Sequence, residues 1–238
     1  MLAHAGWETR LLMRNGEQLL LTLVIPIGLL LVLTLTDVVV QEAGPSRIPR
    51  ALATVLTVSV ISTAFTSLAI ATAFERRSGA LRFLGTTPLT RAELLGGKFL
   101  ATAAVTAVSA GSVAIAALMI GWRPTTGSAW AIPVLLVGAA TFAAWGMALA
   151  GLLRAEAVLA VANGLFLVLI MFGGVVIPAQ SLPGPLATVA SWLPSGALAD
   201  ALAAALISGS APALQDVVVL LGWMAVGAVV ASRTFRWS

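Results

Sequence analysis

The sequence predicts an all-α membrane protein with six transmembrane helices, an N-terminal interfacial amphipathic helix and short re-entrant helices before the last span. The chain is 60% hydrophobic and 9% charged, with a mean hydropathy of +1.05, whereas soluble domains carry about 25% charged residues. Six uncharged stretches divide the 238 residues, and roughly 20 apolar residues cross a bilayer as a helix. The charged residues gather between these stretches.

Residues 1–18, MLAHAGWETRLLMRNGEQ, predict an amphipathic helix that lies in the membrane interface. Trp7, Leu11 and Leu12 can share one helical face, while the charged side chains occupy the others. The alternative is a frayed polar N-terminus. A signal peptide is disfavoured, because the apolar run that follows is long and no clear small-x-small cleavage site comes after it.

The membrane domain, residues 19–238, contains the six uncharged spans. The last span is short and can begin earlier, near Leu214. The predicted spans are Leu19–Thr36, Ala51–Phe74, Phe99–Ile120, Ala129–Leu153, Ala157–Ile177 and Val217–Ser232.

The distribution of basic residues orients these spans. With a cytoplasmic N-terminus, ten Lys and Arg residues fall on the cytoplasmic side and three on the other. The three are Arg47, Arg50 and Arg123, and the ten are Arg10, Arg14, Arg76, Arg77, Arg82, Arg91, Lys98, Arg154, Arg233 and Arg236. The positive-inside rule therefore predicts a multi-pass protein of the cell's inner (cytoplasmic) membrane with both termini in the cytoplasm.

The segment 178–210, before the last span, is apolar but interrupted by Pro178, Pro183, Pro185 and Pro194. Gly196–Ser208 can form a helix of about 20 Å, which is shorter than the hydrocarbon is thick. We expect two short helices that dip into the outer leaflet with their ends covered by protein. The alternative is a seventh span.

Several functional classes are excluded or disfavoured by what the sequence lacks. There is no cysteine and one histidine, His4, so a metal cluster or catalytic triad cannot be built. None of the predicted spans contains an ionisable residue, which disfavours proton coupling. There is no phosphate-binding loop.

We therefore expect no catalytic, cofactor-binding or metal-binding residue in this chain, and no enzyme activity. Energy for transport would come from another chain. The pI of 11.3 does not indicate nucleic-acid binding, because the basic residues lie at helix ends.

Hydroxyl side chains recur at helical spacing in the second and third spans. Two interpretations stay open: the hydroxyls line a path for an amphiphilic substrate, or they serve helix packing. The amide of Asn163 is the strongest polar group inside a span. The candidate path residues are Ser59, Ser62, Thr63, Thr66, Thr102, Thr106 and Asn163.

The loop 75–98, between the second and third spans, concentrates charge. Glu75–Leu84 is expected to be helical, although Gly79 weakens it, with Leu81, Phe83 and Leu84 as an apolar set. Pro88 interrupts the helix. Thr90 and Glu93 then form a capping box that starts the third span at Arg91.

This loop, FERRSGALRFLGTTPLTRAELLGGKFLA, resembles the cytoplasmic loop of ABC-2 type transporter permeases. The second similar stretch is GGVVIPAQSLPGPLATVASWLPSGALADALAAAL, which has Leu193 where the family usually has asparagine and lacks the usual arginine. The loop residues that fit the family pattern are Glu75, Gly79, Leu81, Leu84, Thr87, Pro88, Leu89, Thr90, Arg91, Leu95, Gly97 and Lys98.

The resemblance implies the membrane subunit of an ATP-driven exporter. It implies a second permease chain, in a homodimer or heterodimer, and two separate ATPase subunits that bind ATP and Mg; no cofactor is bound by this chain. The coupling residues implied are Glu75, Arg76, Arg77, Gly79, Leu81, Arg82, Leu84, Pro88 and Leu89. An amphiphilic or lipophilic cargo fits the uncharged spans. The alternatives are a membrane scaffold without a transport cycle and an ion-coupled carrier.

Overall fold

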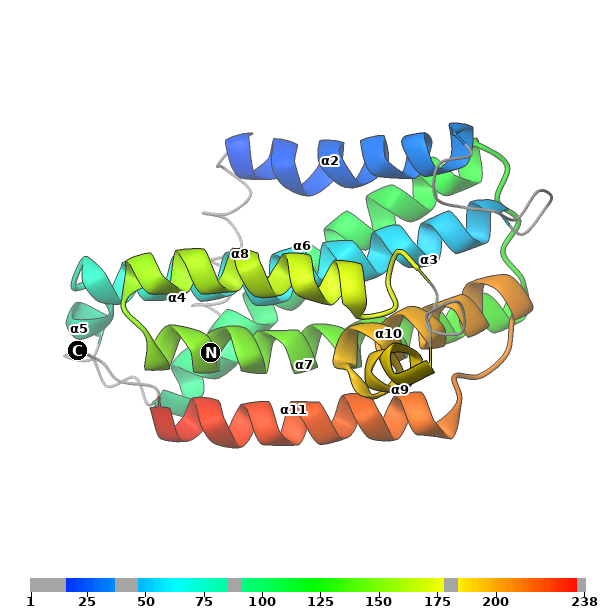
Figure 1. Cartoon of the computed structure of the whole chain (residues 1–238). Coiled ribbons are helices and arrows are strands. Elements are labelled where there is room, and N and C mark those ends of the chain that lie inside the picture. The colour runs from blue at the N-terminus through cyan, green and yellow to red at the C-terminus, as the bar shows by residue number, and fades with distance from the viewer. Residues whose placement is uncertain (1–15, 37–46, 85–90, 178–183, 235–238) are drawn as a thin grey trace.

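Apolar helices account for most of the computed structural model, which describes residues 16–36, 47–84, 91–177 and 184–234 (Figure 1). These ranges contain no β-strand. The helices are α2 (Gly16–Leu35), α3 (Arg47–Val60), the π-helical η1 (Ile61–Ser67), α4 (Leu68–Arg77), α5 (Ala80–Leu84), α6 (Arg91–Met119), the 3₁₀ turn η2 (Thr126–Trp130), α7 (Ala131–Leu152), α8 (Ala155–Phe172), α9 (Gly184–Trp192), α10 (Pro194–Ala203), the π-helical η4 (Ala204–Ser208) and α11 (Leu214–Thr234).

The predicted all-α membrane fold is confirmed. Within the described ranges, five helical segments are long and apolar enough to cross a membrane, and they correspond to the second to sixth predicted spans. The first predicted span corresponds to α2, which has 20 residues and a shorter apolar stretch, Leu23–Leu35. α6, which contains the third predicted span, begins at Arg91, as predicted. α11, which contains the last span, begins at Leu214. Of the predicted interfacial helix, residues 1–15 lie outside the described residues.

The two ends of the bundle carry different elements (Figure 1). One end, which we call the α5 end, holds α5 and the C-terminal ends of α4, α7 and α11. The opposite end, the α10 end, holds α9, α10 and the C-terminal ends of α2 and α6. Successive long helices therefore run in alternating directions, as six crossings require.

The segment before α11 forms two short helices rather than one straight helix. α9 and the α10–η4 unit meet at 84°, a geometry that fits either a broken span or a re-entrant loop. α10 is largely buried against α3, α7 and α11. Its Ser195 hydroxyl donates to the Gly173 carbonyl beyond α8, at 3.2 Å. The re-entrant placement in the membrane stays a prediction, and Pro178 and Pro183 lie outside the described residues.

The core lies where α7 packs against the second span. That span is continuous from Arg47 to Arg77 but contains the π-helical turn η1 at its middle. A Cβ placed on Gly146 of α7 would lie 2.9 Å from the Phe65 carbonyl oxygen in η1. Because lipid gives little hydrophobic drive between helices, close backbone contact at small residues is a main source of packing energy.

A polar seam joins α7 to α11. The Trp145 and Trp223 rings meet edge to face, with centroids 5.5 Å apart, and the Trp145 indole Nε1 donates to the Trp223 carbonyl at 3.0 Å. The Thr141 hydroxyl donates to the Leu220 carbonyl at 3.1 Å. These bonds fix the rotation of α11 on α7.

We predict that Gly146→Ala destabilises the protein by about 1–3 kcal/mol, because the added methyl group overpacks the contact with η1. The matched control is Gly164→Ala on α8, where an added Cβ meets nothing within 4 Å. That control should be neutral or stabilising by up to about 1 kcal/mol, since alanine is the better helix former. Thermal unfolding of the two variants in detergent measures the difference, and equal midpoints would contradict the contact.

Candidate functional site at the α4–α5 corner

The strongest candidate site is the corner where the second span ends and turns into α5. We call Glu75–Leu84 the α4–α5 corner. The prediction of one helix through this segment is wrong: α4 ends at Arg77 and α5 begins at Ala80. Gly79 has φ +80°, a left-handed conformation that glycine adopts readily and that commonly ends helices. The backbone N–H groups of Ser78 and Gly79 donate to the carbonyls of Phe74 and Arg76.

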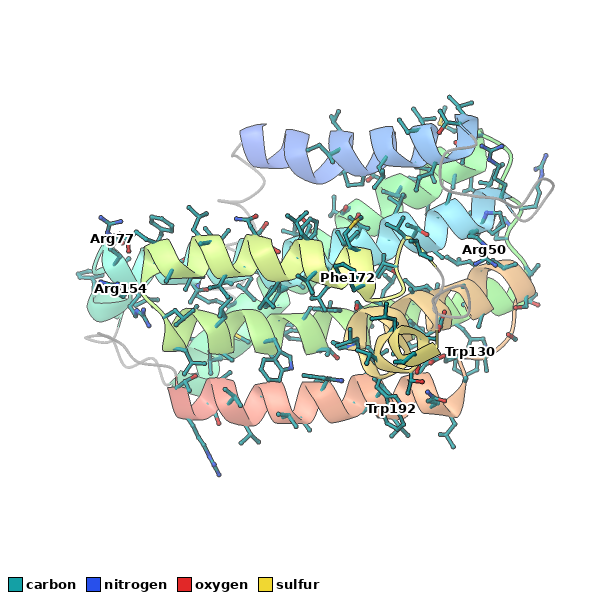
Figure 2. All side chains as sticks on the ribbon, viewed as in Figure 1. Arg50, Arg77, Trp130, Arg154, Phe172 and Trp192 are labelled. Carbon is teal, nitrogen blue, oxygen red and sulfur yellow. The ribbon has the colours of Figure 1, made fainter. Side chains whose placement is uncertain are left out.

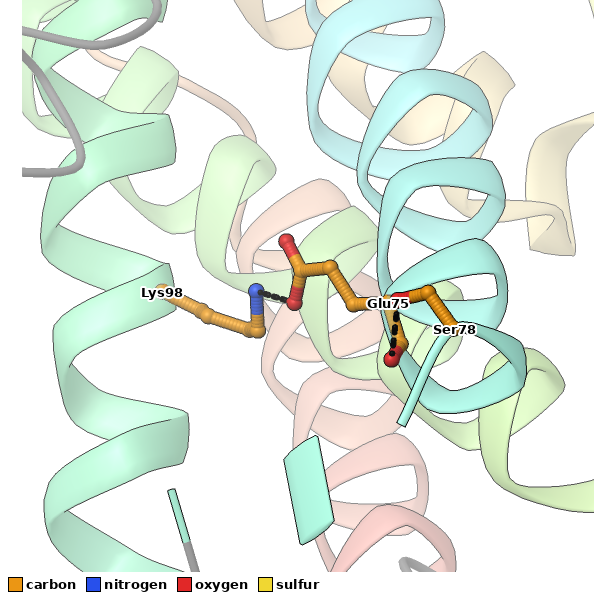
Figure 3. A network of polar contacts seen from close by, with 3 residues as sticks. All are labelled: Glu75, Ser78 and Lys98. Atoms are coloured by element: carbon orange, nitrogen blue, oxygen red, sulfur yellow. Dashed lines mark hydrogen bonds and ion pairs between the residues drawn. The ribbon is translucent and has the colours of Figure 1, made fainter. Parts of the chain in front are cut away.

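Glu75 holds the corner to α6. Its Oε2 lies 2.6 Å from the Lys98 Nζ (Figure 3). The Lys98 side chain is only 4% exposed, whereas that of Glu75 is 37% exposed. A buried ammonium needs a charge partner, because desolvation otherwise costs several kcal/mol. The pair therefore ties the end of the second span to the beginning of the third.

Arg76 holds the corner to the turn between α7 and α8. Its guanidinium donates to the carbonyl oxygens of Gly151, at 3.1 Å, and of Leu153. The last carbonyls of a helix have no partner within the helix, and the helix dipole places partial negative charge there. Arg76 thus satisfies acceptors at, and just beyond, the end of α7.

Arg77 reaches the first turn of α8. Its Nη1 forms an ion pair with Glu156 Oε1, and both side chains are more than half exposed. Such a pair contributes roughly 0–1 kcal/mol. Figure 2 shows Arg77 and Arg154 together at the α5 end. The three consecutive residues Glu75, Arg76 and Arg77 therefore contact three different parts of the membrane domain.

The structure describes the side chains of two large apolar residues in α5, one buried and one exposed. Leu81 is fully buried, whereas Phe83 is 73% exposed. The structure thus offers Phe83, rather than Leu81, at the surface of the corner. The side chains of Arg82 and Leu84, and the whole of Thr87, Pro88, Leu89 and Thr90, lie outside the described residues, so the predicted capping box does too.

The predicted path residues lie on the second span, on α6 and on α8. Ser59 and Thr66, in the second span, and Thr106, in α6, are buried and their hydroxyls have no hydrogen-bond partner among the described residues. Thr106 also lines an apolar cleft between α6 and α7. Ser62 and Thr63 are partly buried in η1, and Thr102 is buried in α6. Asn163 is exposed on α8 and its amide donates to the Leu159 carbonyl of the same helix, at 2.7 Å.

In the described long helices, the ionisable groups lie toward the helix ends, whereas Asp200 lies within the short helix α10. α6 and α11 extend beyond the uncharged spans predicted for them, so Lys98 falls in the N-terminal part of α6 and Asp216 in the first turn of α11. Within the described ranges, no group of three or more His, Cys, Asp or Glu side chains is placed to hold a metal ion. The contacts of this site hold helices together, and its exposed residues present a surface.

Comparison with known proteins now decides the class. The model of the family described as ABC-2 family transporter protein matches residues 32–233. The chain belongs to the ABC-2 transporter family. A similar protein is the "Putative transport permease YvfS" of Bacillus subtilis (strain 168), which is 24% identical over 221 residues, covering 91% of this chain and 89% of that protein. ABC-2 membership indicates a membrane permease, a transport subunit rather than an enzyme, that works with an ABC ATPase.

Sequence reasoning found the charged residues of this ABC-2 loop but missed their partners. The charge count placed Arg77 and Lys98 on one side of the membrane together with the turn that contains Glu156. That placement makes contacts between these loops possible, but the pairing depends on which helices are neighbours. The sequence of the π-helical turn η1 contains several hydroxyl residues but no pattern that predicts a π-helix.

We predict an asymmetry between the two partners of the Lys98–Glu75 pair. Glu75→Gln should destabilise the protein by about 1–2 kcal/mol, because it removes a charge partner from a buried ammonium. Lys98→Met should cost less, since water can solvate the partly exposed carboxylate. A double-mutant cycle on thermal unfolding measures the coupling. A larger loss for Lys98→Met than for Glu75→Gln would contradict this account.

Proposed function

We propose that this chain is the membrane-spanning subunit of an ATP-binding cassette exporter, driven by ATP that a separate ATPase subunit hydrolyses. ATP and Mg²⁺ would bind to that partner. Membership of the ABC-2 family and the similarity to a permease over nearly the whole chain support this assignment.

The observation that carries the proposal is the attachment of the α4–α5 corner. Glu75, Arg76 and Arg77 connect the corner to α6, to the end of α7 and to α8. α4 is itself the last part of the second span. A partner that moves α5 would therefore move several membrane helices together, as a coupling element between an ATPase and a membrane domain must do.

We infer an amphiphilic or lipophilic cargo. The middles of the described long helices contain hydroxyls but no charged side chain, and a charged cargo would be costly to desolvate among such residues. Ser59 lies just before η1 and Thr66 lies near its end. Their buried hydroxyls can form hydrogen bonds with a cargo that has few polar groups. A second permease chain, identical or not, would complete the path within the bilayer.

Phe83→Asp tests the coupling role. We predict that this variant loses most ATPase co-purification and most substrate-stimulated ATP hydrolysis, because a carboxylate replaces an exposed aromatic side chain at the partner-facing corner. Leu214→Asp is the matched control: Leu214 is 79% exposed at the opposite end of the bundle. Leu81→Asp is unsuitable, since Leu81 is fully buried and the change would disturb folding.

Two outcomes would count against this proposal. Normal ATPase binding by Phe83→Asp would remove the corner from the interface. A wild-type complex that binds the ATPase but stimulates neither ATP hydrolysis nor substrate movement would favour a scaffold, and transport without any ATPase would favour an ion-coupled carrier.

The absence of native cysteine allows a direct test of orientation. Ser78 is exposed at the α5 end, and Ala211 is exposed in the turn before α11, at the α10 end. We predict that a membrane-impermeant maleimide labels Ala211→Cys, but not Ser78→Cys, from outside intact cells, and labels Ser78→Cys in inside-out vesicles. The reverse pattern would place the α4–α5 corner outside and remove it from reach of a cytoplasmic ATPase.

A further inference from the structure

A cleft of about 460 Å³ lies between α6 and the η2–α7 segment. Leu52 and Leu56 of α3 and Leu206 of η4 also contribute to its lining. Its volume lies within the range of about 300–1,000 Å³ that is usual for ligand sites. In Figure 1, α6 runs obliquely to α7 and the two helices are separated at the α10 end. The cleft therefore follows from the divergence of two neighbouring helices.

Small residues form the α6 side of this cleft. Ala103, Ala107, Ala110, Gly111 and Ala114 all line it. From Ala103 to Ala114 there are eleven helical steps, or about 16 Å at 1.5 Å per residue. This length is close to half of the roughly 30 Å hydrocarbon thickness. The cleft thus has the length of one acyl chain within a single leaflet, and the absence of large α6 side chains leaves room for it.

The lining is almost entirely apolar, and it contains no charged side chain. On the α7 side, Ile132 and Leu136 line the cleft and are 64% and 52% exposed, so the cleft opens sideways toward the lipid. A polar or ionic ligand would lose its hydration without compensation in such surroundings. A hydrocarbon chain that enters from the bilayer meets no such cost.

One residue in the lining of the cleft has a covered polar atom that lacks the partner it needs. The Trp122 side chain, just beyond the end of α6, is 8% exposed, and its Nε1 has no hydrogen-bond partner in the described parts of the chain. An indole N–H can only donate, so it requires an acceptor. Thr106 also lines the cleft with an unpartnered hydroxyl, but a helical threonine can turn to a carbonyl of its own helix. Trp122 has no such local option and is the more informative of the two.

We propose that this cleft binds one acyl chain of a phospholipid from the leaflet at the α10 end. The chain lies along the small residues of α6, and a rotation of the Trp122 ring, whose Nε1 is covered in this structure, lets that N–H donate to the ester carbonyl oxygen of the lipid. Thr125 and Ser128 line the same cleft in the turn next to Trp122, where their hydroxyls would face the glycerol region of the bound lipid. We refer to this site as the acyl cleft. It does not depend on ATP-driven transport.

Photo-crosslinking of the full-length chain tests the acyl cleft. The probe is a phosphatidylcholine with a diazirine at the middle of one acyl chain, incorporated into phosphatidylcholine vesicles without ATPase or ATP. We expect labels to concentrate on the cleft faces of α6 and α7, severalfold above the exposed face of α8. Equal labelling of α8 and the cleft would overturn the proposal, and it would leave the transport proposal untouched.

Two glycine variants provide a matched comparison. Gly111, in the cleft, and Gly164, on the exposed face of α8, are both helical, and a Cβ on either meets nothing within 4 Å. Gly111→Leu should fill the cleft and reduce its labelling severalfold without changing the labelling of α8. Gly164→Leu should leave cleft labelling as it is. The same cleft labelling in both variants would contradict the proposed site.

The role of Trp122 is tested by comparing ester-linked with ether-linked probes. In the unmodified chain, the ester probe should label the cleft roughly two- to tenfold more than the ether probe, the effect of one net hydrogen bond. Trp122→Phe should bring this ratio to about one while cleft labelling persists. A ratio of one in the unmodified chain would exclude the hydrogen bond, and this measurement needs no variant to fold.

Discussion

The structure depends on how charged side chains satisfy helix ends at the boundary of an apolar medium. A backbone carbonyl without a partner in lipid costs several kcal/mol, and the last carbonyls of each helix have no partner within it. Arg76 donates to the carbonyl of Gly151, in the last turn of α7, and to that of Leu153, just beyond the helix. Its neighbours Glu75 and Arg77 pair with Lys98 on α6 and with Glu156 on α8. The basic residues Arg76, Arg77 and Lys98 of this permease thus fix the geometry of the α4–α5 corner.

Small residues have opposite consequences in two places. At Gly146, a neighbouring backbone approaches so closely that a methyl group does not fit, and the result is a tight helix contact. At Gly111, the neighbouring helix diverges, and the same residue type leaves open space. The difference lies in the angle between the helices rather than in the residue. A glycine or alanine stripe in a membrane helix therefore predicts close approach only where a partner helix runs alongside it.

The sequence predicted the features that depend on composition and order along the chain. Apolar runs of sufficient length and the side preference of basic residues predicted the spans, and the proline-ended loop predicted the start of α6 at Arg91. Features that depend on neighbours in space were out of reach. Nothing in the sequence separates a buried Leu81 from an exposed Phe83 in a five-residue helix, where periodicity cannot be read. The pairing of Arg77 with Glu156 likewise required knowing that the two turns meet.

α6 connects the two ends of the molecule. It carries Lys98, which pairs with Glu75 in the α4–α5 corner, and, from Ala103 to Ala114, the small residues of the acyl cleft. A rigid tilt of α6 would therefore change the width of the cleft and the position of Lys98 together. A ligand shifts such an equilibrium only by the difference between its affinities for the two positions. By linkage, a lipid that prefers one width would favour one position of the corner, and a partner bound at the corner would change the affinity for that lipid by the same factor.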